Sequence, residues 1–212
     1  LAQSWNKPLM EQVGRAIADE MQEYGCTYWL APAVNIHRNP LCGRNFEYFS
    51  EDPYVSGKMA AAAVRGIQSR GRSACPKHFA CNNQEYKRTI NDSRVSERAL
   101  REIYLKGFEI CIKEAKPDNI MTSYNKINGV WGHYQYELCT TVLRKEWGYE
   151  GNVMTDWWTR GEHYKEILAG NDLKMACGFP DRVKQAQELG IIERGDLIRS
   201  AKRVLGLILK ME

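Results

Sequence analysis

The sequence predicts an α/β fold built on a parallel sheet with crossover helices. Segments with the spacing of amphipathic helices alternate at least four times with short apolar segments that suit buried strands. Capping residues, Gly and Pro stand at the boundaries between them. The length of 212 residues suits one domain, and 43% hydrophobic against 26% charged residues is the balance of a globular protein.

The first two elements are a helix and a strand. Residues 6–24 place apolar side chains at helical spacing, open with Asn6 as a capping residue and end before Gly25. Residues 27–36 are rich in Tyr, Trp, Val and Ile, which favour a short buried strand. Pro32 argues against a helix there.

A long polar loop separates this strand from the next helix. We expect the loop over residues 37–53 and an Ala-rich helix over 54–70, which Gly71 ends. Residues 73–81 follow as a second strand, although Pro76 is unusual inside one.

The middle of the chain contains the clearest helix. Ser96 can cap it, Pro117 follows its end, and its inner face is predicted to comprise Leu100, Ile103, Tyr104, Phe108, Cys111 and Ile112. A strand over 119–127, a helix over 136–147 and a strand over 151–158 follow.

The last part of the chain is predicted to form one short strand and two helices. The strand covers residues 172–175. The final helix is expected to be capped by Asp196. Its inward face is predicted to comprise Leu197, Ala201, Val204, Leu205 and Ile208.

Composition and motifs argue against several classes of function. The net charge of +4 comes from scattered Lys and Arg, which disfavours nucleic-acid binding, and no apolar run is long enough to cross a membrane. The four histidines have no metal-ligand spacing, and the chain has no P-loop, dinucleotide or GxSxG motif. Seven cysteines form no CxxC pair, so we expect free buried thiols and favour a cytoplasmic location; secretion would need a leader ahead of Leu1.

Polar side chains stand where the predicted strands end. In parallel sheets the chemistry lies beyond the carboxyl ends of the strands, so these residues mark the expected site. Hydroxyl-binding groups beside an aromatic wall suit a sugar. The residues are Asn35, His37, Arg44, Lys77, His78, Tyr124, Asn125, Asp156, Trp157, Trp158, Asn171 and Asp172.

Five sequence blocks make the expectation specific. They are GRNFEYFSEDP (43–53), KHFACN (77–82), Arg88 with VSERALREIYL (95–105), MTSYN (121–125) and VMTDWW (153–158). In this order they resemble the signatures of glycoside hydrolase family 3. The resemblance implies a (β/α) TIM-like barrel whose first strand would precede Leu1, with barrel strands to about residue 176 and C-terminal helices over 181–212. It implies a retaining, exo-acting β-glycosidase, and we expect a β-D-glucosidase that needs no metal or organic cofactor.

The resemblance also implies roles for individual residues. Asp156 matches the family's catalytic nucleophile, although an Asp after a strand can also cap a helix. Trp157 is expected to stack against the sugar ring, and burial for structural reasons is an equally weighted alternative role. The expected sugar contacts are Arg44, Lys77, His78, Arg88 and Tyr124. Taken singly these have plainer roles: Arg44 could pair with Glu51 or Asp52, and Tyr124 could be a core residue.

The departures from the family pattern bear on the reaction. The acid/base Glu of β-glucosidase-type members lies on a second α/β domain, and KHFACNNQEY (77–86) lacks the His that the N-acetylglucosaminide-specific branch carries there. We therefore expect a β-linked glucoside as substrate and a second domain or fragment as partner. The alternatives are a β-xylosidase, a non-catalytic sugar-binding remnant, and an aldolase-type barrel with Lys77 as Schiff-base lysine.

These expectations predict that residues 1–212 alone do not hydrolyse an aryl β-glucoside. The isolated chain would lack the acid/base carboxylate and would expose unpaired strand edges, which favour aggregation. Purification of this segment and an assay for released phenol check the prediction. A soluble monomer with full activity would contradict it.

Overall fold

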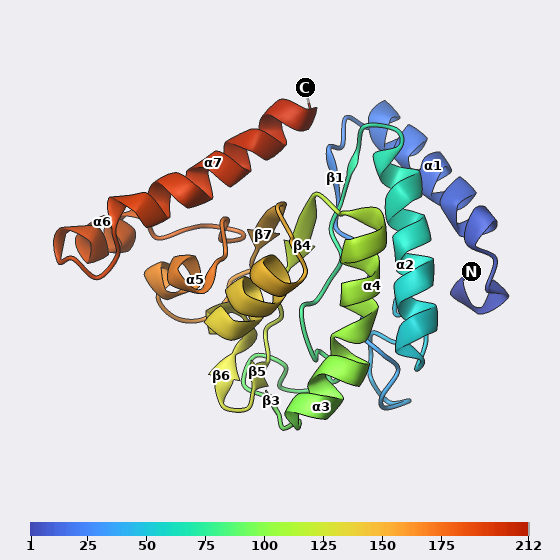
Figure 1. The fold of residues 1–212 in the computed structure, drawn as a ribbon, viewed down its shortest axis with the longest axis horizontal. Helices are drawn as coiled ribbons and strands as arrows, with labels where there is room; N and C mark the ends of the chain where they lie inside the picture. The colour runs from blue at the N-terminus through green and yellow to red at the C-terminus, as the bar shows by residue number, and fades with distance from the viewer. Residues whose placement is uncertain (212) are drawn as a thin grey trace.

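The computed structural model describes residues 1–211 and shows short parallel strands flanked by helices (Figure 1). β1 pairs in parallel with β2, and β4 pairs in parallel with β7. Hydrogen bonds join the two pairs, because Phe79 N donates to Met121 O and Met121 N donates to Pro76 O. The strands therefore follow one another in chain order: β1 (Tyr28–Trp29), β2 (Ser73–Ala74), β4 (Asn119–Met121) and β7 (Asn152–Met154).

Helices connect and cover these strands, as the predicted crossovers require. In Figure 1, α1, α2 and α4 lie on one side of the strands, and α5, α6 and α7 lie on the other. The α-helices are α1 (Lys7–Glu23), α2 (Pro53–Gln68), α3 (Glu97–Ala99), α4 (Lys106–Ala115), α5 (His163–Ala169), α6 (Pro180–Glu188) and α7 (Arg194–Met211). The other helical segments are η1 (Ala2–Ser4), η2 (Leu100–Tyr104), η3 (Gly132–Tyr134) and η4 (Glu137–Glu146). The sequence analysis missed α5, which has only seven residues.

All five predicted strands are shorter than expected, and the ranges 27–36, 73–81 and 151–158 are reduced to β1, β2 and β7. The strand expected over 119–127 ends at Met121. The chain then turns and forms a separate small sheet from β3 (Asp92–Ser93), β5 (Lys126–Ile127) and β6 (Val130–Trp131). The strand expected over 172–175 is reduced to a parallel bridge between Leu173 and Met154.

Side-chain caps begin three helices, and the sequence analysis predicted two of these caps, Asn6 and Ser96. Asn6 accepts from Leu9 N at 3.0 Å, Asp52 accepts from Val55 N, and Ser96 accepts from Ala99 N. The expectation for the last helix was wrong, because Asp196 lies within its first turn. Its carboxylate accepts from the backbone N–H of Glu193, just before the helix begins.

A π-helical turn changes which residues the central helix buries. Leu105 N bonds Leu100 O at 2.8 Å, five residues back, so one residue is added to the turn. The apolar positions beyond the turn are shifted in phase. Leu105 is consequently buried and Ile103 is exposed, contrary to the predicted inner face, whereas Phe108, Cys111 and Ile112 are buried as predicted.

The main core lies between the strands and the helices. Phe79 packs edge-on against Phe108 and Trp147, with ring centroids 5.2 and 5.9 Å apart. Ile120 and Val153 from neighbouring strands are fully buried against it. Burial of such side chains contributes roughly 1.5–3 kcal/mol each to folding.

The predicted inward face of α7 is not buried in this structure. Leu205 and Ile208 are exposed, and the buried residues of the helix are Ser200 and Leu207. The sequence pattern is amphipathic, but α7 meets the rest of the chain along another stripe. Among residues 1–211, no helix has the length and apolar character to span a membrane.

Two glycines let α1 and α2 pack closely. A Cβ on Gly14 would lie 2.7 Å from the carbonyl oxygen of Ala63. A Cβ on Gly66 would lie 2.9 Å from Gly14 Cα and would also meet the carbonyl oxygen of Glu11. Backbone stands on both sides, so no flexible side chain can move away.

Gly66→Ala is therefore expected to destabilise the protein by roughly 1–3 kcal/mol, because the two helices must separate to admit the methyl group. Urea unfolding measures the change. Gly206→Ala is the control, since no atom lies within 4 Å of a Cβ at that helical position. The control should leave stability unchanged or raise it by about 0.5–1 kcal/mol. Equal effects of the two substitutions would contradict the packing argument.

Candidate active site

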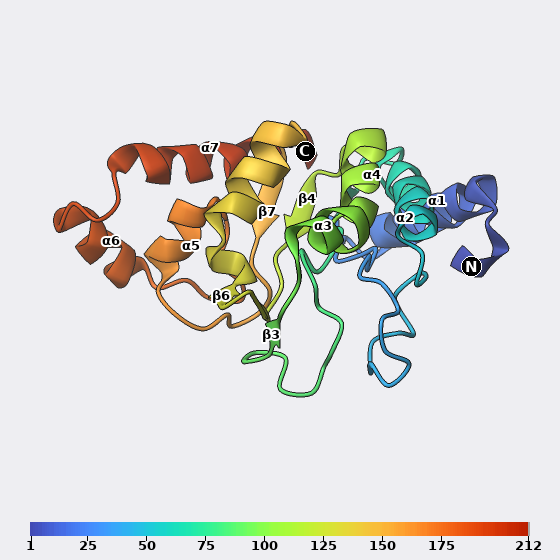
Figure 2. The same ribbon diagram turned by 60° about the horizontal axis from the view of Figure 1, so that its bottom comes forward.

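The predicted site residues come from loops at the carboxyl ends of the strands. Figure 2 shows the loops that follow β1 and β2 projecting from the same side of the molecule. Asp156 follows β7, and Tyr124 follows β4. Neighbouring parallel strands present their carboxyl ends at one edge, so residues far apart in sequence meet there.

Asp156 is a nearly buried carboxylate with one free oxygen. Its residue exposure is 7%, and its Oδ1 accepts from the backbone N–H of Trp157 at 2.7 Å. Oδ2 has no hydrogen-bond partner among residues 1–211 and lies 3.6 Å from His78 Nε2. One oxygen therefore fixes the orientation of the carboxylate while the other is available for chemistry.

Opposing influences act on the pKa of Asp156. Burial raises it above its ordinary value, since a charged carboxylate loses hydration. The Trp157 N–H, the Tyr124 hydroxyl and the nearby cations Arg44 and Arg88 act in the other direction. These groups favour the ionised form that a nucleophile needs.

His78 is a neutral, fixed neighbour of Asp156. Burial is the main cause that lowers its pKa well below the ordinary value, and the charges of Arg44, Lys77 and Arg88 add to the effect. The side-chain amide of Asn35 accepts from His78 N at 2.9 Å and donates to His78 O at 3.0 Å. At 3.6 Å the imidazole and carboxylate are too far apart for a strong mutual bond, so both can bind a third group.

Arg44 and Lys77 share one carboxylate. Arg44 Nε lies 2.5 Å from Glu47 Oε1, and Lys77 Nζ lies 3.4 Å from Glu47 Oε2. The partner expected for Arg44 in its plainer role, Glu51 or Asp52, is not the one observed. Glu47 lies within the GRNFEYFSEDP block, but nothing in its spacing distinguished it from the other two acids of that loop.

Arg88 and Tyr124 form a stacked pair beside Asp156. The Arg88 guanidinium lies 4.6 Å from the centre of the Tyr124 ring, and its NH1 bonds Glu85 at 2.7 Å. The Tyr124 hydroxyl donates to Trp157 O at 2.6 Å. Burial and the charge of Asp156 raise the pKa of Tyr124 to about 12, so the hydroxyl stays protonated and can donate.

The two tryptophans after Asp156 have different surroundings. Trp157 is partly buried against a cluster of Cys75, Met121 and Met154. Trp158 is 69% exposed, and its backbone N–H donates to Met175 O. Part of the Trp157 ring packs inside the protein, which supports the alternative that this residue has a structural role.

Several polar residues expected at this edge have other roles. His37 Nε2 bonds the carbonyl oxygens of Asn45 and Tyr48, and so closes its own loop. Asp172 pairs with Arg144 and Arg203, and Asn171 bonds Thr122 and two carbonyls. Fully engaged groups of this kind hold elements together and do not face a ligand.

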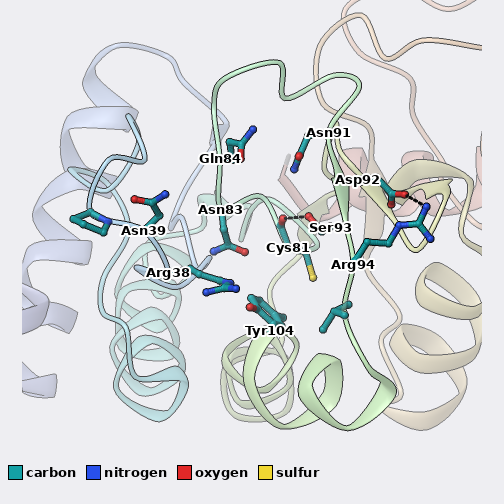
Figure 3. Close-up of a pocket in the computed structure, with 12 residues that line it drawn as sticks. Arg38, Asn39, Cys81, Asn83, Gln84, Asn91, Asp92, Ser93, Arg94 and Tyr104 are labelled. Carbon is teal, nitrogen blue, oxygen red and sulfur yellow. Dashed lines mark hydrogen bonds and ion pairs between the residues drawn. The ribbon is translucent and has the colours of Figure 1, made fainter.

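A separate pocket lies between the loop after β1 and residues 81–95. It has a volume of about 390 Å³, and Figure 3 shows the Arg38 side chain between Asn83 and Tyr104. Its lining includes none of the predicted site residues. The predicted site and this pocket are therefore distinct features of the same loops.

The cysteines and histidines form no metal-binding group in the described chain. Within residues 1–211, no three His, Cys, Asp or Glu side chains are close enough to hold a metal ion. All seven cysteines are free thiols; Cys26 and Cys177 are exposed, contrary to the expectation that all are buried.

A group of three buried residues next to the site was missed by the sequence analysis. Thr159, Glu166 and Lys174 bond one another behind the loop that carries Asp156. Each looks like an ordinary surface residue in the sequence. They are brought together by the short helix α5 and by the parallel bridge between Leu173 and Met154.

Comparison with known proteins identifies close relatives. β-Glucosidase A of Butyrivibrio fibrisolvens is 54% identical over 197 residues, which are 93% of this chain and 24% of that protein. An exo-α-(1→6)-L-arabinopyranosidase of Bifidobacterium longum is 45% identical over 211 residues, covering 99% of this chain and 28% of that protein. The chain thus spans about a quarter of the length of these relatives.

Solved structures share the fold. β-Glucosidase 3B of Thermotoga neapolitana, in complex with glucose, has a TM-score of 0.96 and 46% identity over 99% of this chain and 31% of that chain. A β-glucosidase of Kluyveromyces marxianus has a TM-score of 0.97 at 36% identity, over 99% of this chain and 26% of its own. The predicted α/β, TIM-barrel-like class is confirmed by these matches.

The model of the glycosyl hydrolase family 3 N-terminal domain matches residues 1–207, which is nearly the whole chain. The five sequence blocks, the parallel strand order and the relatives agree with this match. The chain therefore belongs to glycosyl hydrolase family 3.

Proposed function

We propose that this chain binds the glucose unit and supplies the nucleophile of a retaining, exo-acting β-D-glucosidase. The observation that carries the proposal is the free Oδ2 of Asp156 beside neutral His78, in a buried site bordered by cations. Such a carboxylate is oriented and partly desolvated, and its hydrogen-bond donors and cationic neighbours act in favour of the ionised form. These are the properties required for attack on an anomeric carbon.

The reaction proceeds by double displacement in this proposal. Asp156 Oδ2 attacks the anomeric carbon while a carboxylic acid protonates the departing glycosidic oxygen. The acid, now an ionised carboxylate, then removes a proton from water. The water breaks the ester to Asp156 and releases glucose with its configuration retained. Arg44, Lys77, His78, Arg88 and Tyr124 bind sugar hydroxyls, and each charged bond contributes about 1.5–3 kcal/mol.

The acid/base carboxylate is proposed to come from outside this chain. The glutamates nearest to the proposed sugar contacts, Glu47 and Glu85, are held in ion pairs with Arg44, Lys77 and Arg88. The relatives are about four times as long as the chain, which leaves room for a further domain. A second α/β domain or fragment that contributes a Glu fits both observations.

The identity of the sugar rests on the relatives. Several are named β-glucosidases, and two are named exo-α-(1→6)-L-arabinopyranosidases. Glucose differs from xylose only in carrying a CH₂OH group, whose recognition is worth about 1–3 kcal/mol, whereas L-arabinopyranose lacks that group and also differs in the configuration at C4. Aryl glycosides of all three sugars should therefore be compared in one assay. A β-xylosidase is the alternative reading.

The full-length protein is expected to form a covalent intermediate on Asp156. A 2-fluoro-2-deoxy-β-glucoside with a good leaving group should label this residue, because the fluorine slows breakdown of the ester. Mass spectrometry of the peptide locates the label. Binding of glucose without any label or turnover would instead indicate a non-catalytic sugar-binding remnant.

Asp156→Asn should lower kcat for an aryl β-glucoside by at least about 10³-fold, since the amide cannot form the ester. The folded state should persist, because the amide oxygen can still accept from Trp157 N. Steady-state kinetics and circular dichroism measure the two effects. Asp19→Asn, the same change at an exposed position on α1, serves as the control, and retained activity in Asp156→Asn would contradict the assignment.

Tyr124→Phe should move the acidic limb of the pH profile of kcat/KM toward higher pH. The Tyr124 hydroxyl lowers the pKa of Asp156, so its removal lets burial raise that pKa further. More of the carboxylate is then protonated, and inactive, at a given acidic pH. Measurement of kcat/KM between pH 4 and about 8 tests the direction. An acidic limb that stays in place or moves to lower pH would contradict the argument.

A further inference from the structure

The loop that carries Asp156 is tied to residues 173–175 by backbone bonds on both sides of the carboxylate. Thr155 N donates to Leu173 O at 2.9 Å, and Trp158 N donates to Met175 O at 2.8 Å. The Thr155 hydroxyl accepts from Met175 N at 3.0 Å and donates to Asp156 O at 2.9 Å. The position of Asp156 is therefore coupled to that of residues 173–175.

Lys174, in the middle of this segment, extends its side chain into a buried ion pair. Its Nζ lies 2.7 Å from Glu166 Oε1 and 2.9 Å from Oε2, and both side chains are 1% exposed. Glu166 lies on α5, which begins seven residues after Asp156. The pair therefore joins residues 173–175 to the helix beyond the Asp156 loop.

Thr159 completes the group from within the loop itself. The Lys174 ammonium donates to Thr159 Oγ1 at 2.8 Å and to Thr159 O at 3.1 Å. Thr159 Oγ1 donates in turn to Glu166 Oε1 at 2.7 Å. All three ammonium protons of Lys174 can therefore be donated in hydrogen bonds. Through Thr159, these bonds hold the loop that carries Asp156.

His133 extends the contacts toward Tyr124. Its Nε2 lies 3.1 Å from Arg160 O, next to Thr159, and its Nδ1 lies 3.4 Å from Ser123 O, next to Tyr124. The imidazole is 1% exposed. The neutral imidazole therefore lies between the two strand ends that carry Tyr124 and Asp156, and its single N–H can donate to one of the two carbonyls.

Burying an ion pair to hold a loop costs desolvation free energy. Two charges lose hydration, and apolar side chains of similar size often stabilise a fold as well or better. What the pair does supply is one defined geometry, because both carboxylate oxygens and the ammonium have fixed partners.

We propose that Thr159, Glu166 and Lys174 form a latch that positions Asp156 for attack on the sugar. The three residues do not contact the sugar themselves. The inference rests on the proposed function of Asp156 and adds positioning residues to it. A displacement of about 1 Å at a reacting group can cost 10²-fold in rate, so loss of the latch should slow glycosyl-enzyme formation. Binding of the sugar should change little, since its hydroxyl contacts come from other loops.

The test measures how fast a 2-fluoro-2-deoxy-β-glucoside labels Asp156 in the full-length protein. Glu166→Gln and Lys174→Met should each slow labelling about 10- to 100-fold, with KM for an aryl β-glucoside within about threefold of the wild type. Thr159→Val keeps the shape of the side chain and should slow labelling by about three- to tenfold. Rates are expressed per folded molecule.

Two further variants separate positioning from stability. Lys210→Met breaks another ion pair, with the buried Asp118 at the amino end of β4, away from the Asp156 loop, and should lower Tm while labelling continues at the wild-type rate. The double variant Glu166→Leu/Lys174→Met leaves no unpaired charge, so its Tm should exceed that of either single variant while labelling stays slow. The double variant and Thr159→Val decide the question if the single variants do not fold.

Labelling at the wild-type rate in folded latch variants would overturn the proposal. Equal slowing in Lys210→Met, or recovery of the rate together with Tm in the double variant, would also overturn it. If the wild-type protein itself is not labelled at Asp156, the proposed function fails, and that outcome is distinct from failure of the latch.

Discussion

The site depends on keeping one carboxylate charged where little water reaches it. Burial raises the free energy of the ionised Asp156. Its neighbours lower that energy again through the Trp157 N–H, the Tyr124 hydroxyl and two guanidinium groups. The strand order, the loops and the stacked Arg88 all contribute to placing these groups. A carboxylate in open water would need none of these contacts to stay charged.

Much of the fold could be predicted from the sequence because local signals agree with the final structure. The caps at Asn6 and Ser96, the helices that follow them and the strand order are all visible in residue patterns. The position of Asp156 at the end of β7 followed from an apolar run that stops at a polar residue. The gathering of Arg44, Lys77, His78, Arg88 and Tyr124 around it followed from matched blocks, not from periodicity. Their roles on a sugar stay predictions.

The remaining features depend on contacts that a residue pattern does not encode. The π-helical turn at Leu100–Tyr104 inserts one residue, so helical periodicity misplaced Ile103 and missed Leu105. The amphipathic pattern of α7 does not say which stripe meets the strands, and Leu205 is exposed. Asp172 has the polarity of a site residue, but two arginines from distant helices engage it. Glu166 and Lys174 meet only through tertiary packing.

The ion pairs at the site set its local charge balance. Glu47 is shared between Arg44 and Lys77, and Arg88 pairs with Glu85. Three cations stand beside three carboxylates when Asp156 is included, so their formal charges cancel. These six groups then add little to the long-range field of the chain, whose net charge is +4. They give a phosphorylated or uronic sugar no electrostatic steering of their own. Their charges act at short range, on the groups that come into contact with them, where dissolved salt screens little.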